Sequence, residues 1–266
     1  MVILNDKIYI SYLNEPKENC LNVEIMVGEF NYDFIKFEPF FQPSECISRD
    51  FPIFNSHAAG GKLVKIDENH IGLTIGDFNI FGLSQDTKSI YGKIYSINVN
   101  NSNLKLISSG HRNPQGLHKV LDRDILIETE HGPRGGDEIN IIKKDKNYGW
   151  PIITSGEEYF GGKIGEGSYS PEYESPLWTW IPSIAPSGMA FYDRNMFENF
   201  KGHLLIGSLK FKSLYLVKIK DNLPISEEII FQNKIGRIRD VEVGWDGSIY
   251  LLTDEKKGGL FKLYKN

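Results

Sequence analysis

Residues 110 to 150 hold a high density of side chains that bind anions, metals or polar ligands. The segment combines cationic, amide, imidazole and carboxylate groups: Arg112, Asn113, His131, Arg134, Asp137 and Glu138. A hydrophobic core would have to supply a partner for each of these groups once it left water. Glycines at 132, 135 and 136 let backbone carbonyls and amides approach a ligand, and Pro133 restricts the turn. The segment therefore predicts a polar binding site.

Further charged residues lie outside this segment. Arg237 and Arg239 alternate along an expected strand, so both side chains point to one face. Because two cations repel each other, a shared anion such as a cofactor carboxylate explains the pair better than a bare surface does. Lys210 ends another expected strand, where an ordinary surface lysine is the alternative.

Two other groups suit catalysis and metal binding. His57 precedes a Gly-Gly pair and is a candidate general base, with an ordinary loop histidine as the alternative. Asp137 and Glu138 lie beside glycines that can present carbonyl oxygens, a set of hard ligands that suits calcium. A solvated acidic pair is the alternative for these two carboxylates.

One pattern of short strands recurs along the whole chain. An apolar strand, a turn of Asp, Asn or Gly and a second strand with a polar end appear five times, for example over 1–12, 62–77 and 239–254. Most of these units are followed by a third strand, and no segment has a convincing 3.6-residue apolar period. The pattern predicts an all-β fold, a β-propeller of four-stranded antiparallel sheets with about five blades, in which strand ends and loops gather around a central axis.

The overall composition is that of a globular protein. The chain has 266 residues, and its net charge of -5 argues against a nucleic-acid partner, which would require a basic face. It contains no apolar run long enough for a membrane span, and its first residues lack the parts of a signal peptide. Cys20 and Cys46 are predicted either to form a disulfide or to be two buried free thiols.

Several motifs together resemble one protein family. They are the 110–150 segment, Asn55-Ser-His57-Ala-Ala-Gly-Gly-Lys-Leu, Thr74-Ile-Gly-Asp77, Trp180-Ile-Pro-Ser-Ile-Ala-Pro-Ser-Gly-Met, Gly207-Ser-Leu-Lys210 and Gly236-Arg-Ile-Arg-Asp-Val. This set resembles the soluble, pyrroloquinoline-quinone (PQQ)-dependent aldose sugar dehydrogenases of the glucose/sorbosone dehydrogenase family. The resemblance covers nearly the whole chain.

The resemblance implies a set of site residues. His57 would be the catalytic base, assisted by Arg112. The quinone would be bound by Arg112, Asn113, His131, Trp178, Ser183, Lys210, Arg237 and Arg239, with Trp180 as an alternative stacking partner. One calcium ion would bind the carbonyls of Gly132 and Pro133, and a structural calcium would lie near Glu138 and Tyr148, with Asp137 as a further oxygen ligand. The implied reaction is hydride transfer from the anomeric carbon of an aldose to PQQ, which gives an aldonolactone. A soluble electron acceptor would then reoxidise the cofactor.

Members of this family have six blades. We therefore expect residues 1–266 to form a single propeller domain that lacks the family's first blade, as an amino-terminally truncated chain of uncertain activity. Apolar residues that include Ile8, Ile10, Leu251 and Phe261 are expected to face the resulting gap. Location in the periplasm or outside the cell is implied by the resemblance alone.

Two other functional classes stay open. A calcium-dependent propeller lactonase would need metal-binding carboxylates at the axis, and Asp77, Glu130 and Asp254 are the candidates. A non-enzymatic propeller could serve as a binding module, although the joint presence of His57, Arg112 and the three later cations argues against it. The sequence of the 154–176 segment does not identify the sugar, and the oligomeric state is open.

Overall fold

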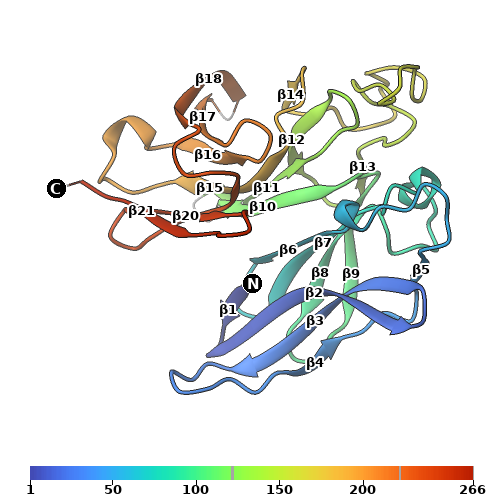
Figure 1. Cartoon of the computed structure of the whole chain (residues 1–266), viewed down its shortest axis with the longest axis horizontal. Coiled ribbons are helices and arrows are strands. Elements are labelled where there is room, and N and C mark those ends of the chain that lie inside the picture. Colours follow the sequence, from blue (N-terminus) through green and yellow to red (C-terminus); the bar gives the residue numbers. More distant parts are fainter. Residues whose placement is uncertain (121–122, 222, 266) are drawn as a thin grey trace.

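The computed structural model describes residues 1–120, 123–221 and 223–265. Five β-sheets follow one another along the chain and surround a common centre (Figure 1). Helical structure in these residues is confined to short 3-10 turns such as η1 (Ser56–Ala58), and none of their helices is long and apolar enough to cross a membrane. The predicted all-β propeller with five blades is confirmed.

The first two sheets are larger than predicted, with five strands each. The first sheet contains β1 (Val2–Leu4), β2 (Lys7–Lys17), β3 (Cys20–Glu29), β4 (Glu38–Phe41) and β5 (Ile47–Ser48). The second contains β6 (Gly60–Lys65), β7 (His70–Ile75), β8 (Lys93–Asn98), β9 (Leu104–Ser109) and β13 (Lys146–Asn147). All pairs in them are antiparallel except that of β13 with β9.

The other three sheets follow in chain order. The third contains β10 (Pro114–Val120), β11 (Ile125–Glu130), β12 (Asp137–Ile142) and β14 (Trp178–Trp180). The fourth contains β15 (Pro186–Tyr192), β16 (His203–Ser208), β17 (Ser213–Lys220) and β18 (Leu223–Gln232). The fifth contains three described strands, β19 (Ile238–Val243), β20 (Ile249–Thr253) and β21 (Leu260–Leu263). Among the described residues, the third and fourth sheets alone therefore have the four strands that were predicted for every blade.

The first strands of the last four sheets form the centre of the molecule. Strand β6 contacts β10, β10 contacts β15, and β15 contacts β19. Each of these strands has a register shift near its start, between Gly60 and Leu63, Pro114 and Gly116, Pro186 and Met189, and Ile238 and Asp240. Such bulges change the direction in which side chains point. Because Arg112, Asn113, Arg237 and Arg239 lie at or just before these bulges, the fold directs them to one end of the sheets.

Four apolar clusters fill the interfaces between successive sheets. Ile25 and Leu73 belong to the cluster between the first and second sheets, and Ile94 and Leu117 to the one between the second and third. The next two interfaces are filled in the same way, by clusters that include Ile139 with Leu204, and Leu205 with Ile238. Alternate residues of each strand supply these clusters, as expected for sheets that pack face to face.

Four apolar residues of the first and last sheets were predicted to face a gap in the ring, and this prediction is wrong for two of them. Leu251 is fully buried in the cluster between the fourth and fifth sheets, and its neighbour Leu252 points the other way and is 47% exposed. Strand alternation is sensitive to a one-residue error, which places a side chain on the opposite face. Ile8 is buried as well, because it pairs with Gly28, over which the side chains of Ile35 and Phe37 lie. Ile10 is partly buried, and Phe261 is exposed as predicted.

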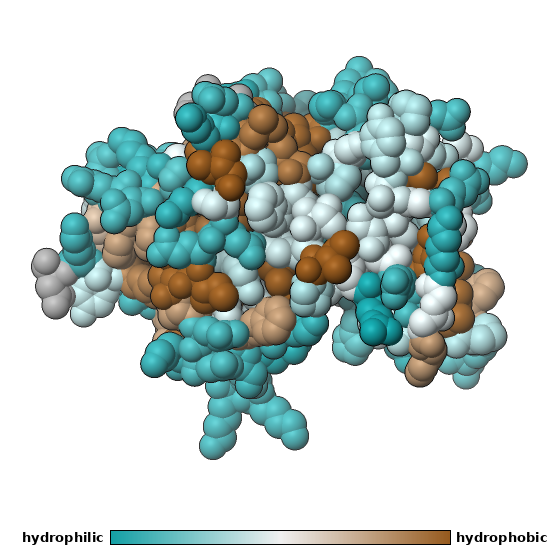
Figure 2. Space-filling view, turned by 90° about the horizontal axis from the view of Figure 1, so that it is seen from above, coloured by the Kyte–Doolittle hydropathy of each residue, from teal (hydrophilic) through white to brown (hydrophobic). Residues whose placement is uncertain are grey.

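The surface is largely polar on the face shown in Figure 2, where apolar residues form separate patches. Exposed large apolar residues in the described chain include Phe160 and Trp245. Scattered apolar residues of this kind are common on protein surfaces.

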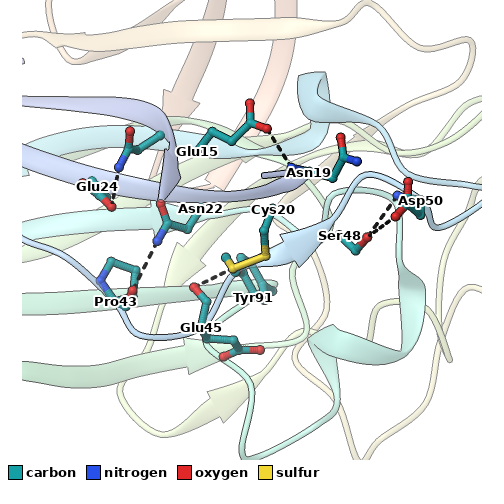
Figure 3. Close-up of a disulfide and its surroundings, with 12 residues drawn as sticks. Glu15, Asn19, Cys20, Asn22, Glu24, Pro43, Glu45, Ser48, Asp50 and Tyr91 are labelled. Atoms are coloured by element: carbon teal, nitrogen blue, oxygen red, sulfur yellow. Dashed lines mark hydrogen bonds between the residues drawn. A yellow bond between two sulfur atoms is a disulfide. The ribbon is translucent and has the colours of Figure 1, made fainter. Parts of the chain in front are cut away.

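Cys20 and Cys46 form a disulfide, which resolves the alternative left by the sequence (Figure 3). The bond joins the start of β3 to the segment before β5. Glu45, which precedes Cys46, accepts hydrogen bonds from the Ser89 hydroxyl and the Ile90 amide, both at 2.9 Å. The disulfide therefore anchors a segment that connects the first sheet to the second.

Candidate functional site

A cavity of about 550 Å³ lies where the ends of the central strands converge. Residues from all five sheets or their connecting segments line it, including Leu13 of β2 and Leu209, which follows β16. Six of the predicted site residues meet there: His57, Arg112, Asn113, His131, Arg237 and Arg239. Its size is that of a small-molecule site, and its lining is rich in cations.

His57 lies in the short turn η1 on the cavity wall. The Asn55 side chain caps this turn by accepting a hydrogen bond from the His57 amide at 2.9 Å. The Asn113 amide Nδ2 donates to the His57 carbonyl at 3.3 Å. The backbone is thus held on both sides, while the side chain is exposed and no described residue hydrogen-bonds to its ring. Such a ring is able to accept a proton from a ligand.

The Arg112 guanidinium is buried beside the cavity. Its Nη1 donates to the carbonyls of His131 and Gly132, at 3.1 and 2.8 Å, and its Nη2 donates to Asn79 Oδ1 at 3.2 Å. The Trp150 ring centroid lies 5.4 Å from its Cζ, a distance that permits a cation-π interaction. Its Nε is buried without a hydrogen-bond partner among the described residues. The described residues thus leave this donor unsatisfied.

A chain of polar contacts crosses the cavity. Asn113 Oδ1 accepts hydrogen bonds from the Gly60 amide at 3.2 Å and from Gln115 Nε2 at 2.8 Å. Gln115 Oε1 in turn accepts from Arg239 Nη1 at 3.0 Å. The His57 segment is thereby connected to the arginine pair. Gln115 was not predicted as a site residue.

Arg237 and Arg239 share one carboxylate. Nη2 of Arg239 lies 2.5 Å from Asp254 Oδ2, and Nη2 of Arg237 lies 3.7 Å from the same atom. The Arg239 hydrogen bond lowers the pKa of Asp254. Two guanidinium groups against one carboxylate leave an excess of positive charge, which suits an anionic ligand.

His131 contacts the cavity as a neutral group. Its Nε2 lies 2.6 Å from the Pro186 carbonyl and must donate to it. Burial, together with the charges of Arg112, Arg239 and Arg237, lowers the pKa of His131 to about 4, although the Pro186 contact raises it.

The predicted calcium carbonyls lie next to Arg112. The Gly132 carbonyl accepts from Arg112, and the Pro133 carbonyl accepts from the Ser183 hydroxyl at 3.3 Å. Each carbonyl oxygen has a second lone pair that a cation could use. Asp137 supports both segments, because its Oδ1 accepts from the Gly132 amide at 2.9 Å and its Oδ2 from the Ala185 amide at 2.7 Å.

Three carboxylates form a second polar cluster on β11 and β12: the buried Glu128 and Glu130 and the partly buried Glu138. Asn140 Nδ2 lies within 3.3 Å of oxygens of Glu128, Glu130 and Glu138. His111 Nδ1 lies 3.2 Å from Glu130 Oε1, and the His111 ring stacks on Tyr148 at 4.7 Å. Glu128 Oε1 and Asn140 Oδ1 have no partner among the described residues.

The electrostatics of this cluster favour a bound cation or a proton. Burial, followed by the charge of Glu130, raises the pKa of Glu138 to about 8 and raises the pKa of Glu128 as well. One atom each of His111, Glu128 and Glu130 lie within 4.8 Å of one another. The Tyr148 hydroxyl is already engaged, because it donates to the Ile141 carbonyl and accepts from the Lys143 amide. The sequence predicted Glu138 and Tyr148 here and named Glu130 only as a metal-binding carboxylate of the lactonase alternative. His111, Glu128 and Asn140 were missed.

Three predicted cofactor residues do not line the cavity: Trp178, Ser183 and Lys210. Trp178 packs against the apolar cluster between the third and fourth sheets, and its indole nitrogen has no partner among the described residues. Lys210 is exposed, and its Nζ donates to the Ser183 carbonyl at 2.9 Å. Tyr159 does line the cavity, from the 154–176 segment whose sequence did not identify the sugar, and it is 61% exposed.

The chain matches the model of the family described as Glucose / Sorbosone dehydrogenase over residues 4–262. It is 33% identical over 273 residues to the aldose sugar dehydrogenase YliI of Escherichia coli (strain K12), a match that covers 97% of this chain and 72% of that protein. A crystal structure of a glucose dehydrogenase is similar with a TM-score of 0.88 and 31% identity, and the match covers 98% of this chain and 79% of that one.

A more distant structure is the PQQ-bound form of an aldose sugar dehydrogenase from Streptomyces coelicolor. It is similar with a TM-score of 0.72 and 22% identity, over 98% of this chain and 75% of that one. At this identity the likeness shows a shared fold.

Proposed function

The chain belongs to the glucose/sorbosone dehydrogenase family, and on this premise we propose that it oxidises the anomeric carbon of an aldose sugar with PQQ as its cofactor. The observation that carries this proposal is the convergence of His57 and four cationic or amide side chains on one cavity of about 550 Å³: Arg112, Asn113, Arg237 and Arg239. A cation-lined cavity beside a histidine that can accept a proton suits an anionic redox cofactor and a neutral sugar.

The residues present fit the quinone. PQQ carries three carboxylates, and the cavity offers two arginines that share Asp254. Lys210 lies outside the lining, follows the cavity residue Leu209 in the chain and donates to the Ser183 carbonyl. The unpaired Nε of Arg112 provides a buried donor for a quinone oxygen. We assign Arg237, Arg239 and Lys210 to the carboxylates, and Arg112 and Asn113 to the quinone oxygens, where donors stabilise developing negative charge. The aldose sugar dehydrogenase from Streptomyces coelicolor, which shares the fold, is PQQ-bound.

His57 acts as general base in this proposal. Its ring takes the proton of the anomeric hydroxyl while a hydride leaves the anomeric carbon, and the sugar becomes an aldonolactone. When bound, PQQ supplies the acceptor for that hydride. Neutral His131, whose Nε2 already donates to the Pro186 carbonyl, keeps its place beside the cations without adding charge.

We also propose two calcium sites. The free lone pairs of the Gly132 and Pro133 carbonyls suit a cation beside the cofactor, where a Lewis acid would polarise a quinone oxygen. The buried cluster of Glu128, Glu130 and Glu138 suits a structural cation, because ionised carboxylates at this depth require neutralisation. A disulfide is typical of oxidising compartments, which supports the periplasm or the cell exterior as the location.

The lactonase alternative receives no support from the positions of its candidate carboxylates. Asp254 lines the cavity but pairs with Arg239, whereas Asp77 is fully buried against Trp150 and Glu130 is engaged with His111. They do not converge as metal ligands at the axis. A binding module without activity is distinguished from the proposed dehydrogenase by the following assay.

The test is reduction of an artificial electron acceptor dye by purified protein supplied with PQQ, calcium chloride and a panel of aldoses. We expect turnover that requires both PQQ and an aldose with a free anomeric hydroxyl. The methyl glycoside of the best sugar is the matched control, because it lacks that proton. Specific PQQ binding without turnover on any aldose would favour a binding module, and the absence of PQQ binding would overturn the proposal.

A further inference from the structure

A largely buried lysine joins two central strands of different sheets. Lys62 of β6 places its Nζ 2.6 Å from Oδ1 and 2.7 Å from Oδ2 of Asp240 in β19. The Lys62 side chain is 12% exposed and that of Asp240 is 31% exposed, so solvent screens this pair less than an ordinary surface pair. Strands β6 and β19 belong to the second and fifth sheets, which are separated along the chain by the third and fourth sheets. The ion pair therefore connects them across the central axis.

Both partners are adjacent to cavity residues. Gly60 and Gly61 immediately precede Lys62 and line the cavity, and Arg239 immediately precedes Asp240 and lines it from the other side. The Lys62 amide donates to Thr74 Oγ1 at 2.9 Å, and Asp240 Oδ1 accepts from the Val241 amide at 3.0 Å. Each partner is thus fixed to its own strand, and the ion pair transmits the position of one strand to the other.

The surrounding sequence makes room for this contact. A Cβ added at Gly188 of β15 would lie 1.8 Å from Asp240 Oδ1, so only glycine lets β19 approach with this carboxylate in place. Glu242 Oε1 lies 3.8 Å from Lys62 Nζ and adds a second negative charge. Nearby His118 is neutral, because burial, followed by the charge of Lys62, lowers its pKa to about 4. Lys62 is thus held between acidic partners of β19.

We propose that Lys62 and Asp240 are positioning residues that set the location of Arg239 relative to the His57 segment. The hydrogen bonds from Gly60 through Asn113 and Gln115 to Arg239 run between the same two strands and depend on the same spacing. Breaking the ion pair lets β19 move away from β6, which displaces the Arg239 guanidinium from a ligand carboxylate. This inference rests on the proposed function, in which Arg239 binds a carboxylate of PQQ.

The test compares the unchanged protein with Lys62→Met, which keeps the length of the side chain and removes its charge, and with Asp240→Asn. The matched control is Lys218→Met, which breaks the exposed 3.0 Å pair with Glu228 inside the fourth sheet. Two quantities are measured: the PQQ dissociation constant by fluorescence titration in the presence of calcium, and the hydrogen exchange of the backbone amides over 237–241. A charge-swapped double variant, Lys62→Asp with Asp240→Lys, tests for rescue.

We expect Lys62→Met and Asp240→Asn to weaken PQQ binding by roughly 10- to 100-fold, by analogy with the loss of metal affinity when the supporting partners of metal ligands are removed. Exchange over 237–241 should accelerate in both, the swapped variant should recover part of the affinity, and Lys218→Met should change neither quantity. Unchanged affinity and exchange in Asp240→Asn, the variant with the least change in shape, would overturn the inference. If the unchanged protein fails to bind PQQ, the proposed function falls, and the exchange measurement still decides whether the ion pair holds Arg239 in place.

Discussion

Trp150 donates a hydrogen bond from its indole Nε1 to the Asp77 carboxylate at 2.7 Å, with both residues buried. Arg112 contacts both residues. Its guanidinium lies over the Trp150 ring, and its carbonyl accepts a hydrogen bond from the Asp77 amide at 2.8 Å. Asp77 thus supports the Arg112 segment in two ways: its backbone amide bonds the Arg112 carbonyl, and its carboxylate holds the Trp150 ring on which the guanidinium lies. The carboxylate belongs to the scaffold beneath the cavity.

This burial predicts a pH dependence of stability. Burial raises the pKa of Asp77 from 3.8 to about 6, although Arg112 and the hydrogen bonds from Asn79 and Trp150 oppose the shift. Because the folded state holds the proton more tightly than the unfolded chain, Asp77 favours folding at low pH, and this contribution is lost as pH rises from about 4 to 6. The free energy of unfolding of Asp77→Asn minus that of the unchanged protein should therefore increase by about 2–3 kcal/mol as the pH rises from 4 to 7. Chemical denaturation at four pH values with a chelator present checks this, and a difference independent of pH would contradict it.

Removal of the proposed base should separate chemistry from binding. His57→Ala deletes an exposed ring that no described residue hydrogen-bonds, so the fold and the arginine pair stay intact. We expect PQQ affinity within about threefold of the unchanged protein, while aldose-dependent dye reduction falls by roughly 100- to 10,000-fold. His70→Ala is the control, since His70 pairs with Asp67 in an exposed turn. Turnover at the original rate in His57→Ala would remove this residue from the role of base.

Calcium should stabilise the protein through the buried carboxylates. At a free calcium concentration about 100 times the dissociation constant, binding adds about 2.7 kcal/mol, which corresponds to a rise in Tm of roughly 5–10 °C. Glu128→Gln, which neutralises the side chain with an unpaired oxygen, should reduce this rise, and Glu157→Gln outside the cluster should leave it unchanged. Thermal unfolding with and without a chelator measures the effect. An equal rise in Glu128→Gln would place the bound calcium elsewhere.

Calcium should also be required for the cofactor. The Gly132 and Pro133 carbonyls are proposed to bind a cation that contacts PQQ, so a chelator should abolish saturable PQQ binding in a fluorescence titration, and added calcium should restore it. Magnesium is the control cation, because its small size and preference for octahedral geometry make it a poor substitute in a site built from carbonyls. PQQ binding that is unchanged by the chelator would remove the metal from this site.

The sequence predicted those features of the site and fold that depend on the spacing of residues close together in the chain. Arg237 and Arg239 lie two positions apart, just before and at the start of β19, and both line the cavity. Five repeated units were recognisable because each begins with an apolar strand and a polar turn. These features are encoded within a few residues, and packing elsewhere in the molecule does not alter them.

The sequence could not predict contacts between residues that lie far apart along the chain. Gln115 meets Arg239 across 124 positions, and Lys62 meets Asp240 across 178. Trp178 was assigned to the cofactor because it adjoins a segment implied to cover the quinone, but the face of β14 on which it lies packs against the core. Which face of a strand meets the core is decided by the neighbouring sheet, and the same uncertainty affected Leu251.

Asp137 should affect both cofactor-binding segments. Its two oxygens accept from the Gly132 and Ala185 amides, so Asp137→Asn turns one accepting oxygen into a donor that faces an N–H group. An unsatisfied buried donor costs about 1–3 kcal/mol. We expect that loss in the free energy of unfolding, together with weaker PQQ binding. Asp145→Asn, in an exposed turn, is the control. Full stability and affinity in Asp137→Asn would show that these amides need no carboxylate.

The last prediction concerns the disulfide between Cys20 and Cys46. It closes a segment with a sequence separation of 26, for which the chain-entropy estimate of stabilisation is about 3–4 kcal/mol. Glu45 extends its effect to the second sheet, since its side chain accepts from Ser89 and Ile90 and its carbonyl accepts from the buried Tyr91 hydroxyl at 3.2 Å (Figure 3). A double Cys20→Ser, Cys46→Ser variant should therefore have a lower Tm, and hydrogen exchange over 89–91 should accelerate. Dithiothreitol should lower the Tm of the unchanged protein to a similar value and leave the double variant unaffected. Equal Tm values for the unchanged protein and the double variant would show that the Glu45 contacts hold this junction without the covalent bond.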